Sequence, residues 1–116
     1  MEKEKVFAMP VSKVYPLLTA KVERKGRTKS ELDEVTCWLT GYSLEELNLQ
    51  LEKGVSYKTF FEEAPCINPN YGLIKGSICG IKLESIEDPL MLKIRQLDKL
   101  VDELAKGKAM EKILRK

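Results

Sequence analysis

TKSELDEVTCWLTGYSLEE, residues 28–46, contains two helix-capping signatures only fifteen residues apart. The stretches TKSE at 28–31 and SLEE at 43–46 each place a hydroxyl at a helix N-cap and a carboxylate three residues later. Each pair can therefore satisfy two backbone N–H groups that a first helical turn leaves without partners. Gly41 and Gly54 stand where a left-handed residue ends a helix. The pattern predicts short helices with sharp boundaries.

Hydrophobic periodicity extends this pattern along the rest of the chain. Together with the capping residues it predicts helices over residues 10–26 with Ser12 as the cap, 29–39, 44–51, 57–63, 88–105 and 109–114. In the first of these helices the apolar positions at helical spacing are Val14, Leu17, Leu18 and Val22. The segment 88–105 is the clearest, because Asp88 can cap it and Pro89 suits its first helical position.

The apolar residues of the segment 88–105 form a short heptad seam. They are spaced 4, 3, 4 and 3 residues apart at Leu90, Ile94, Leu97, Val101 and Leu104. Such a seam is either the core-facing stripe of a bundle helix or part of a dimer interface, and its length of two heptads favours the core. We therefore expect this helix to support the centre of the fold.

Residues 73–84 fit two structures. Ile74, Ile78 and Ile81 repeat at helical spacing, but Gly76 and Gly80 lower helix propensity and leave room for a short strand. Such a strand would pair with the N-terminal residues, which we expect to form an arm or an edge strand.

The sequence thus predicts a mainly α protein, a compact bundle of five to six short helices with one minor β-strand pair as an option. Residues 1–116 are expected to form a single domain, with 1–9 as an N-terminal arm and 109–116 as a C-terminal tail helix.

Composition is that of an ordinary soluble globule. The chain has 116 residues, of which 43% are hydrophobic and 33% charged. No apolar run approaches the roughly 20 residues of a membrane span, and the charged start does not resemble a signal peptide. The three cysteines are odd in number and widely spaced, as expected for reduced thiols. These features predict a cytoplasmic protein that does not enter a membrane.

The chain contains no histidine. Nucleophiles activated by histidine and imidazole metal sites are therefore excluded within one chain. Adjacent carboxylates point in different directions along a helix, and no phosphate-binding glycine motif is present. We expect no catalytic residues, no metal and no cofactor, which argues against an enzyme. Catalysis by carboxylate, tyrosine or cysteine side chains alone stays open as a third alternative.

Charge is distributed unevenly although the net charge is only +2. Residues 1–30 carry a net +5, residues 31–64 a net −6, and residues 65–116 a net +3. This asymmetry suggests complementary faces, either within one fold or between subunits. One basic cluster stands out as a candidate anion-binding patch: Lys21, Arg24, Lys25, Arg27 and Lys29. The simpler interpretation is a solvated helix end whose cations favour the helix dipole.

Two further features have structural explanations. The segments 29–39 and 44–51 have helix-turn-helix proportions, but the second carries carboxylates that would repel a phosphate backbone. A helix hairpin in a core is the better interpretation. Cys37 and Cys79 are interpreted as packing residues, since no histidine can activate either thiol.

Several stretches resemble one bacterial family. They are KGRTK at 25–29, WLTGY at 38–42, EDPLM at 87–91 and DKLVDELAKGKAMEKIL at 98–114. On these stretches the chain resembles domain of unknown function family number 2200, over nearly its whole length. The resemblance implies a small, mainly helical, cytoplasmic bacterial protein without an established activity, so it carries no functional residue over to this chain.

The sequence therefore favours a non-catalytic protein-interaction or regulatory module that binds a protein partner or a second copy of itself. The alternative is weak binding of nucleic acid or another polyanion through residues 21–29.

Overall fold

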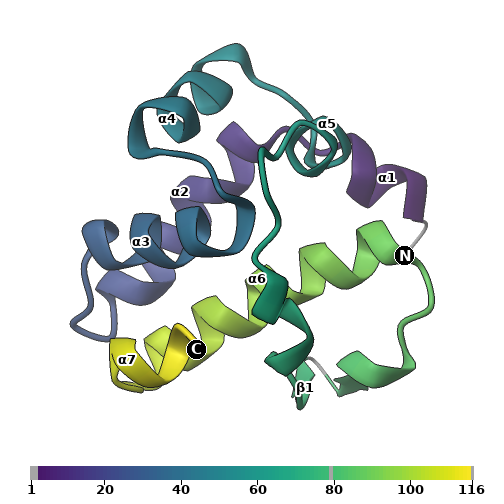
Figure 1. Cartoon of the computed structure of the whole chain (residues 1–116). Helices are drawn as coiled ribbons and strands as arrows, with labels where there is room; N and C mark the ends of the chain where they lie inside the picture. Colours follow the sequence, from purple (N-terminus) through teal and green to yellow (C-terminus); the bar gives the residue numbers. More distant parts are fainter. Residues whose placement is uncertain (1–2, 79, 116) are drawn as a thin grey trace.

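The computed structural model describes residues 3–78 and 80–115, and Figure 1 shows how they are arranged. The elements in chain order are α1 (Lys3–Ala8), α2 (Val11–Glu23), α3 (Lys29–Thr40), α4 (Leu44–Lys53), α5 (Tyr57–Glu62), the 3-10 helix η1 (Pro69–Leu73), β1 (Ser77–Ile78), β2 (Ile81–Lys82), the 3-10 helix η2 (Leu83–Ser85), α6 (Pro89–Ala105) and α7 (Met110–Ile113). The predicted mainly α class is confirmed, with seven α-helices in the described residues rather than five to six.

Helix α6 lies at the centre of the fold. It contacts α2, α3, α5, α7, β1 and η2, which surround it in Figure 1. The Asp88 side chain caps its start by accepting hydrogen bonds from the N–H groups of Leu90 and Met91, both at 3.0 Å. Its fully or nearly fully buried residues are Ile94, Gln96, Leu97, Leu100, Val101, Glu103 and Leu104. The heptad seam is therefore a core-facing stripe, as its short length suggested.

Both predicted capping boxes are present. Glu31 N–H donates to the Thr28 hydroxyl at 3.1 Å, and Thr28 N–H donates to the Glu31 carboxylate at 3.0 Å. Ser43 and Glu46 exchange the same two bonds at 3.1 and 2.8 Å. Helices α3 and α4 therefore begin where the sequence predicted, and α4 ends two residues later than residue 51, at Lys53.

Gly41 ends α3 in the left-handed conformation, with φ of 82°. The position is also crowded, because an added Cβ atom would lie 2.6 Å from the carbonyl oxygen of Cys66. Backbone hydrogen bonds from Cys66 N–H to Thr40 and from Asn68 N–H to Leu39 bring this later segment against the end of α3. Glycine is thus required here for two separate reasons.

The start of α2 differs from the prediction. Pro10 occupies the N-cap position, so Ser12 lies inside the first turn and does not cap the helix. The core-facing side chains are Val11, Tyr15 and Val22. Leu17 was expected on this face but is 69% exposed, because the helix is rotated to bury Tyr15.

The N-terminal residues also differ from the expected arm or edge strand. Residues 3–8 form helix α1, which packs against α5 and buries Val6. A single bridge between Pro10 and Ser56 joins the α1–α2 connection to the α4–α5 connection. Burial of one apolar face against α5 is sufficient to order this short helix.

Two short strands, β1 and β2, lie within residues 73–84, so the strand alternative is confirmed. No α-helix forms among the described residues of this stretch, although its ends, residue 73 and residues 83–84, belong to the 3-10 helices η1 and η2. Strands β1 and β2 pair antiparallel with each other, not with the N-terminal residues. Gly76 and Gly80 have φ of 107° and 79°, which a helix cannot accommodate. Cys79 lies outside the described residues, so its predicted packing role is not addressed.

The C-terminal helix α7 falls within the predicted tail helix and is fastened to α6. Ile113 is fully buried, and the Arg115 guanidinium donates to both carboxylate oxygens of Glu103 at 2.8 and 2.7 Å. Burial alone would raise the pKa of Glu103, but hydrogen bonds and charge from Arg115 and Lys108 outweigh it. The pKa of Glu103 therefore lies below its ordinary value.

Within the described residues, no helix combines the length and the apolar character that crossing a bilayer requires.

Substitution of Leu97 tests the central position of α6. Leu97 is fully buried, so Leu97→Asp places an unpaired charge in the core and should abolish the cooperative thermal transition followed by circular dichroism. Leu17→Asp is the matched control, because Leu17 is 69% exposed and should retain a native-like transition. A native-like melt for Leu97→Asp would contradict this placement of α6.

The Glu103–Arg115 pair predicts a pH-dependent loss of stability. Arg115→Gln should lower the free energy of unfolding at pH 7 by about 2 kcal/mol, because it removes two charge-assisted hydrogen bonds. Since the folded-state pKa of Glu103 is depressed, this stabilisation is present above its ordinary value of 4.5 and is lost as pH falls through the folded-state pKa.

Urea unfolding of wild type and Arg115→Gln across this pH range measures the effect. The difference between them should shrink once Glu103 is protonated. Lys106→Gln serves as the control, because Lys106 is 73% exposed and its ion pair with Asp102 is therefore weak. This substitution should lower the free energy of unfolding by less than about 1 kcal/mol. Equal effects of the two substitutions would argue against a specific role of Arg115.

Candidate functional site

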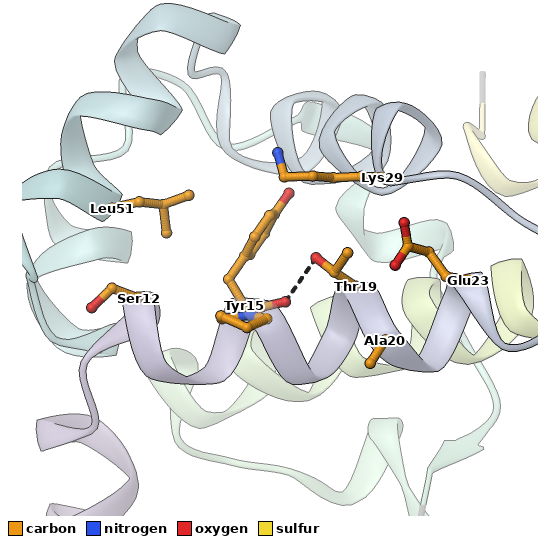
Figure 2. A pocket seen from close by; sticks show the side chains of 8 residues that line it. Ser12, Tyr15, Thr19, Ala20, Glu23, Lys29 and Leu51 are labelled. Carbon is orange, nitrogen blue, oxygen red and sulfur yellow. Dashed lines mark hydrogen bonds between the residues drawn. The ribbon is translucent and has the colours of Figure 1, made fainter.

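An open groove runs along the outer face of α2. Figure 2 shows Leu51 of α4 reaching over one end near Ser12, Glu23 at the other end, and Lys29 of α3 above Tyr15. The volume of this groove is about 340 Å³, within the usual range of ligand sites. We call it the apolar groove, lined by Ser12, Tyr15, Pro16, Thr19, Ala20, Glu23, Lys29 and Leu51.

The helical repeat explains why these α2 residues lie together. Positions 12, 15, 16, 19, 20 and 23 recur at intervals of three and four residues and so share one face. Most of them present carbon atoms to the groove. The Thr19 hydroxyl donates to the Tyr15 carbonyl at 3.0 Å, so it is satisfied within the helix.

A polar network fixes the floor of the apolar groove. The Tyr15 hydroxyl donates to Asp33 at 2.6 Å, and the Lys29 ammonium donates to the other oxygen of Asp33 at 2.9 Å. The Lys29 nitrogen also lies 5.8 Å from the centre of the Tyr15 ring. Burial, followed by the bond to Asp33, raises the pKa of Tyr15 well above its ordinary value. Tyr15 therefore stays a neutral hydroxyl near neutral pH and holds α2 against α3 through Asp33.

A second, more polar groove crosses α3 and the start of α4, with a volume of about 490 Å³. We call it the polar groove, lined by Lys29, Ser30, Asp33, Glu34, Cys37, Tyr42, Ser43 and Leu44. Lys29 lines both grooves, so they meet at the start of α3. Together they include lining residues from α2, α3 and α4.

The field in the polar groove is negative. Burial raises the pKa of the half-buried Cys37 thiol, and the charges of Asp33 and Glu46 raise it further. Burial and the nearby Glu63 and Glu46 raise the pKa of Tyr42 to about 12. Cys37 was expected to be a packing residue; it packs against the core and also lines this groove. Its raised pKa makes it a poor nucleophile at neutral pH.

Arg27, a member of the predicted anion-binding cluster, has a structural role. Its guanidinium binds the Glu31 carboxylate at 2.8 Å and donates to the backbone carbonyls of Lys108 at 2.8 Å and Leu104 at 3.4 Å. It therefore joins the α2–α3 turn to the end of α6.

The other four members of the cluster do not form one site. Lys21 pairs with Asp102 at 3.8 Å, and Lys29 is bound to Asp33 inside the grooves. Arg24 and Lys25 are exposed and have no ion pair among the described residues. Anion binding by this cluster stays a prediction, with Arg24 and Lys25 as its freest members.

Metal binding has no candidate site in residues 3–78 and 80–115, where no three cysteine or acidic side chains are grouped closely enough to hold an ion. Neither groove was predicted from the sequence. Tyr15 could have been found, because Val11, Tyr15 and Val22 share the core-facing spacing. Nothing in the sequence indicated that Leu51 would close the groove.

Comparison with known proteins gives a consistent family but no activity. The family model described as "Uncharacterized protein conserved in bacteria (DUF2200)" matches residues 5–115. The crystal structure of uncharacterized protein SP1917 is similar, with a TM-score of 0.91 and 46% sequence identity, covering 97% of this chain and 93% of that chain. A search of curated proteins found no significant match.

Alkylation tests the environment of Cys37. Because its pKa is raised, Cys37 should react with iodoacetamide at pH 7.5 several-fold more slowly than the exposed Cys66, as measured for each cysteine by mass spectrometry. Glu46→Gln should speed the reaction of Cys37 and leave Cys66 unchanged. Faster alkylation of Cys37 than of Cys66 in the wild type would contradict the negative field.

Proposed function

This chain belongs to the bacterial family DUF2200, and from the geometry of its grooves we propose that it is a small non-catalytic module that binds a protein partner through the apolar groove. The observation that carries the proposal is an open, mostly carbon-lined surface on α2, where the hydroxyls of Tyr15 and Thr19 are hydrogen-bonded within the protein. Such a surface gains free energy when a partner covers it.

Binding is favoured over catalysis by the state of the reactive groups. The hydroxyl of Tyr15 is committed to Asp33, and the thiol of Cys37 has a raised pKa in a negative field. Histidine is absent from the sequence. Neither Tyr15 nor Cys37 is therefore placed to act as a base or nucleophile near neutral pH.

The heptad seam no longer supports an interaction role, because Ile94, Leu97, Val101 and Leu104 are buried in the core. The apolar groove is instead the surface available to a partner. A second copy of the chain is one form that the partner could take, and it would appear as a dimer in solution. The chain would act as a regulator if its binding in the groove changes the activity of the partner protein.

The cytoplasm is the location that fits this role. Cys37 and Cys66 are free thiols, as is usual in a reducing compartment.

Polyanion binding is the second candidate. It is supported by the exposed side chains of Arg24 and Lys25, whereas Arg27 is required to hold the turn against α6. Arg24→Glu with Lys25→Glu is therefore the appropriate variant, and it should abolish any capture of nucleic acid while the fold persists.

A tagged pull-down with nuclease treatment tests the proposed function. Wild-type protein should retain a stoichiometric protein partner, and Ala20→Arg should lose it, because a long charged side chain would fill the apolar groove. Both Ala20 and Leu17 are exposed on α2, so Leu17→Arg is the matched control and should keep the partner.

Three results would count against the proposal. A partner that is kept by Ala20→Arg, or lost equally with both variants, would place binding elsewhere. Capture of ribosomal and nucleoid proteins only without nuclease, and its loss with Arg24→Glu and Lys25→Glu, would favour the polyanion alternative.

A further inference from the structure

The charged side chains that line the two grooves are one lysine, Lys29, and three carboxylates, Glu23, Asp33 and Glu34. Lys29, which lines both grooves, is neutralised by Asp33 at 2.9 Å. Glu23 lines the apolar groove and Glu34 lines the polar groove, and the side chains of both are exposed without a hydrogen bond or ion pair among the described residues.

Burial is the first cause of the raised pKa of Cys37 and of Tyr42, which line the polar groove, and nearby carboxylates raise both further. Asp33 and Glu46 act on Cys37, and Glu46 and Glu63 act on Tyr42. An anionic occupant would therefore meet repulsion from several carboxylates, whereas a cationic occupant would supply partners to Glu23 and Glu34.

The shape of the apolar groove suits a helix. From Ser12 to Glu23 the groove follows α2 for about 16 Å, which is three helical turns. All of its lining residues belong to helices, six to α2, with Lys29 from α3 and Leu51 from α4. An extended peptide would find no strand edge here to pair with, while a helix brings its own backbone already satisfied.

The floor of the groove is apolar and interrupted by few polar atoms. Pro16 and Ala20 are exposed on α2, Leu51 forms a wall, and the polar atoms of Tyr15 and Thr19 are occupied by internal hydrogen bonds. An incoming side chain would therefore need to be apolar, at the spacing of one helix face.

From these observations we propose that the partner presents a cationic amphipathic helix, which lays its apolar face along Pro16, Ala20 and Leu51 and places lysine or arginine side chains beside Glu23 and Glu34. This inference rests on the proposed function and adds the chemistry of the partner. It assigns Glu23 and Glu34 to specificity, because they reject acidic helices of the same shape.

Two synthetic peptides of about 18 residues, long enough for five helical turns, test the inference. They share one leucine and alanine face, and their polar faces carry only lysine in one and only glutamate in the other. Binding is measured by isothermal titration calorimetry with the full chain. The lysine peptide should bind at least about tenfold more tightly than the glutamate peptide, and the preference should fall as salt is raised.

Variants then locate the contact. Ala20→Arg should abolish binding of the lysine peptide, and Leu17→Arg should not. Glu23→Gln with Glu34→Gln should weaken it about fivefold, because two rim charges are lost. The control is Glu45→Gln with Glu52→Gln, which changes net charge equally at exposed positions of α4 outside both grooves and should have little effect.

Several results would overturn the inference. They are equal binding of the two peptides, failure of both to bind, or an equal loss with the Glu45 and Glu52 control. The outcome for the proposed function is separate. If Ala20→Arg loses the lysate partner but the lysine peptide does not bind the wild type, the groove binds a partner of other chemistry. If Ala20→Arg changes neither the capture of the lysate partner nor the binding of the peptide, both proposals are wrong.

Discussion

The fold depends on the burial of helix α6 on more than one face. Each buried face needs neighbouring elements that match it, apolar side chains on one face and hydrogen-bond partners on the other. The apolar face of α6 receives α2, α3 and α5. Gln96 and Glu103, two turns apart, form a polar face: Gln96 donates to the Tyr71 carbonyl at 3.1 Å and Glu103 accepts from Arg115. The apolar face packs against the N-terminal helices, and the polar face binds η1 and the C-terminal residues through hydrogen bonds. A single helix thus supports two kinds of packing.

The grooves follow from this arrangement. Helices α2 and α3 use their inner faces on α6, so their outer faces are left for other contacts. The bond between Tyr15 and Asp33 fixes α2 against α3, and the capping box of Ser43 sets where α4 departs. Helix α4 covers part of the outer surface and leaves the rest open, with its carboxylates nearby. Local capping chemistry therefore influences the shape and the charge of a surface formed by three helices.

The helix starts that carry capping residues could be predicted from the sequence. The capping boxes at Thr28 and Ser43 and the Asp88–Pro89 start gave correct boundaries, because each interaction lies within four residues. The rotation of α2 was not predicted, since Leu17 and Tyr15 both fit a helical repeat and only contact with Asp33 selects the tyrosine. Helix α1 was not predicted, because its order depends on contact with α5, where Val6 is buried. The apolar groove was beyond reach because α2 and Leu51 meet only after folding.

Gly41 also links two parts of the chain in their dynamics. The amides of Cys66 and Asn68 are bound to the last carbonyls of α3, and the missing side chain at Gly41 is what allows this approach. When the final turn of α3 frays, these two amides lose their acceptors; when residues 66–68 lift away, the helix end loses its donors. The two segments therefore open and close as one cooperative unit, so a residue in an irregular connection shares the protection of a buried helix.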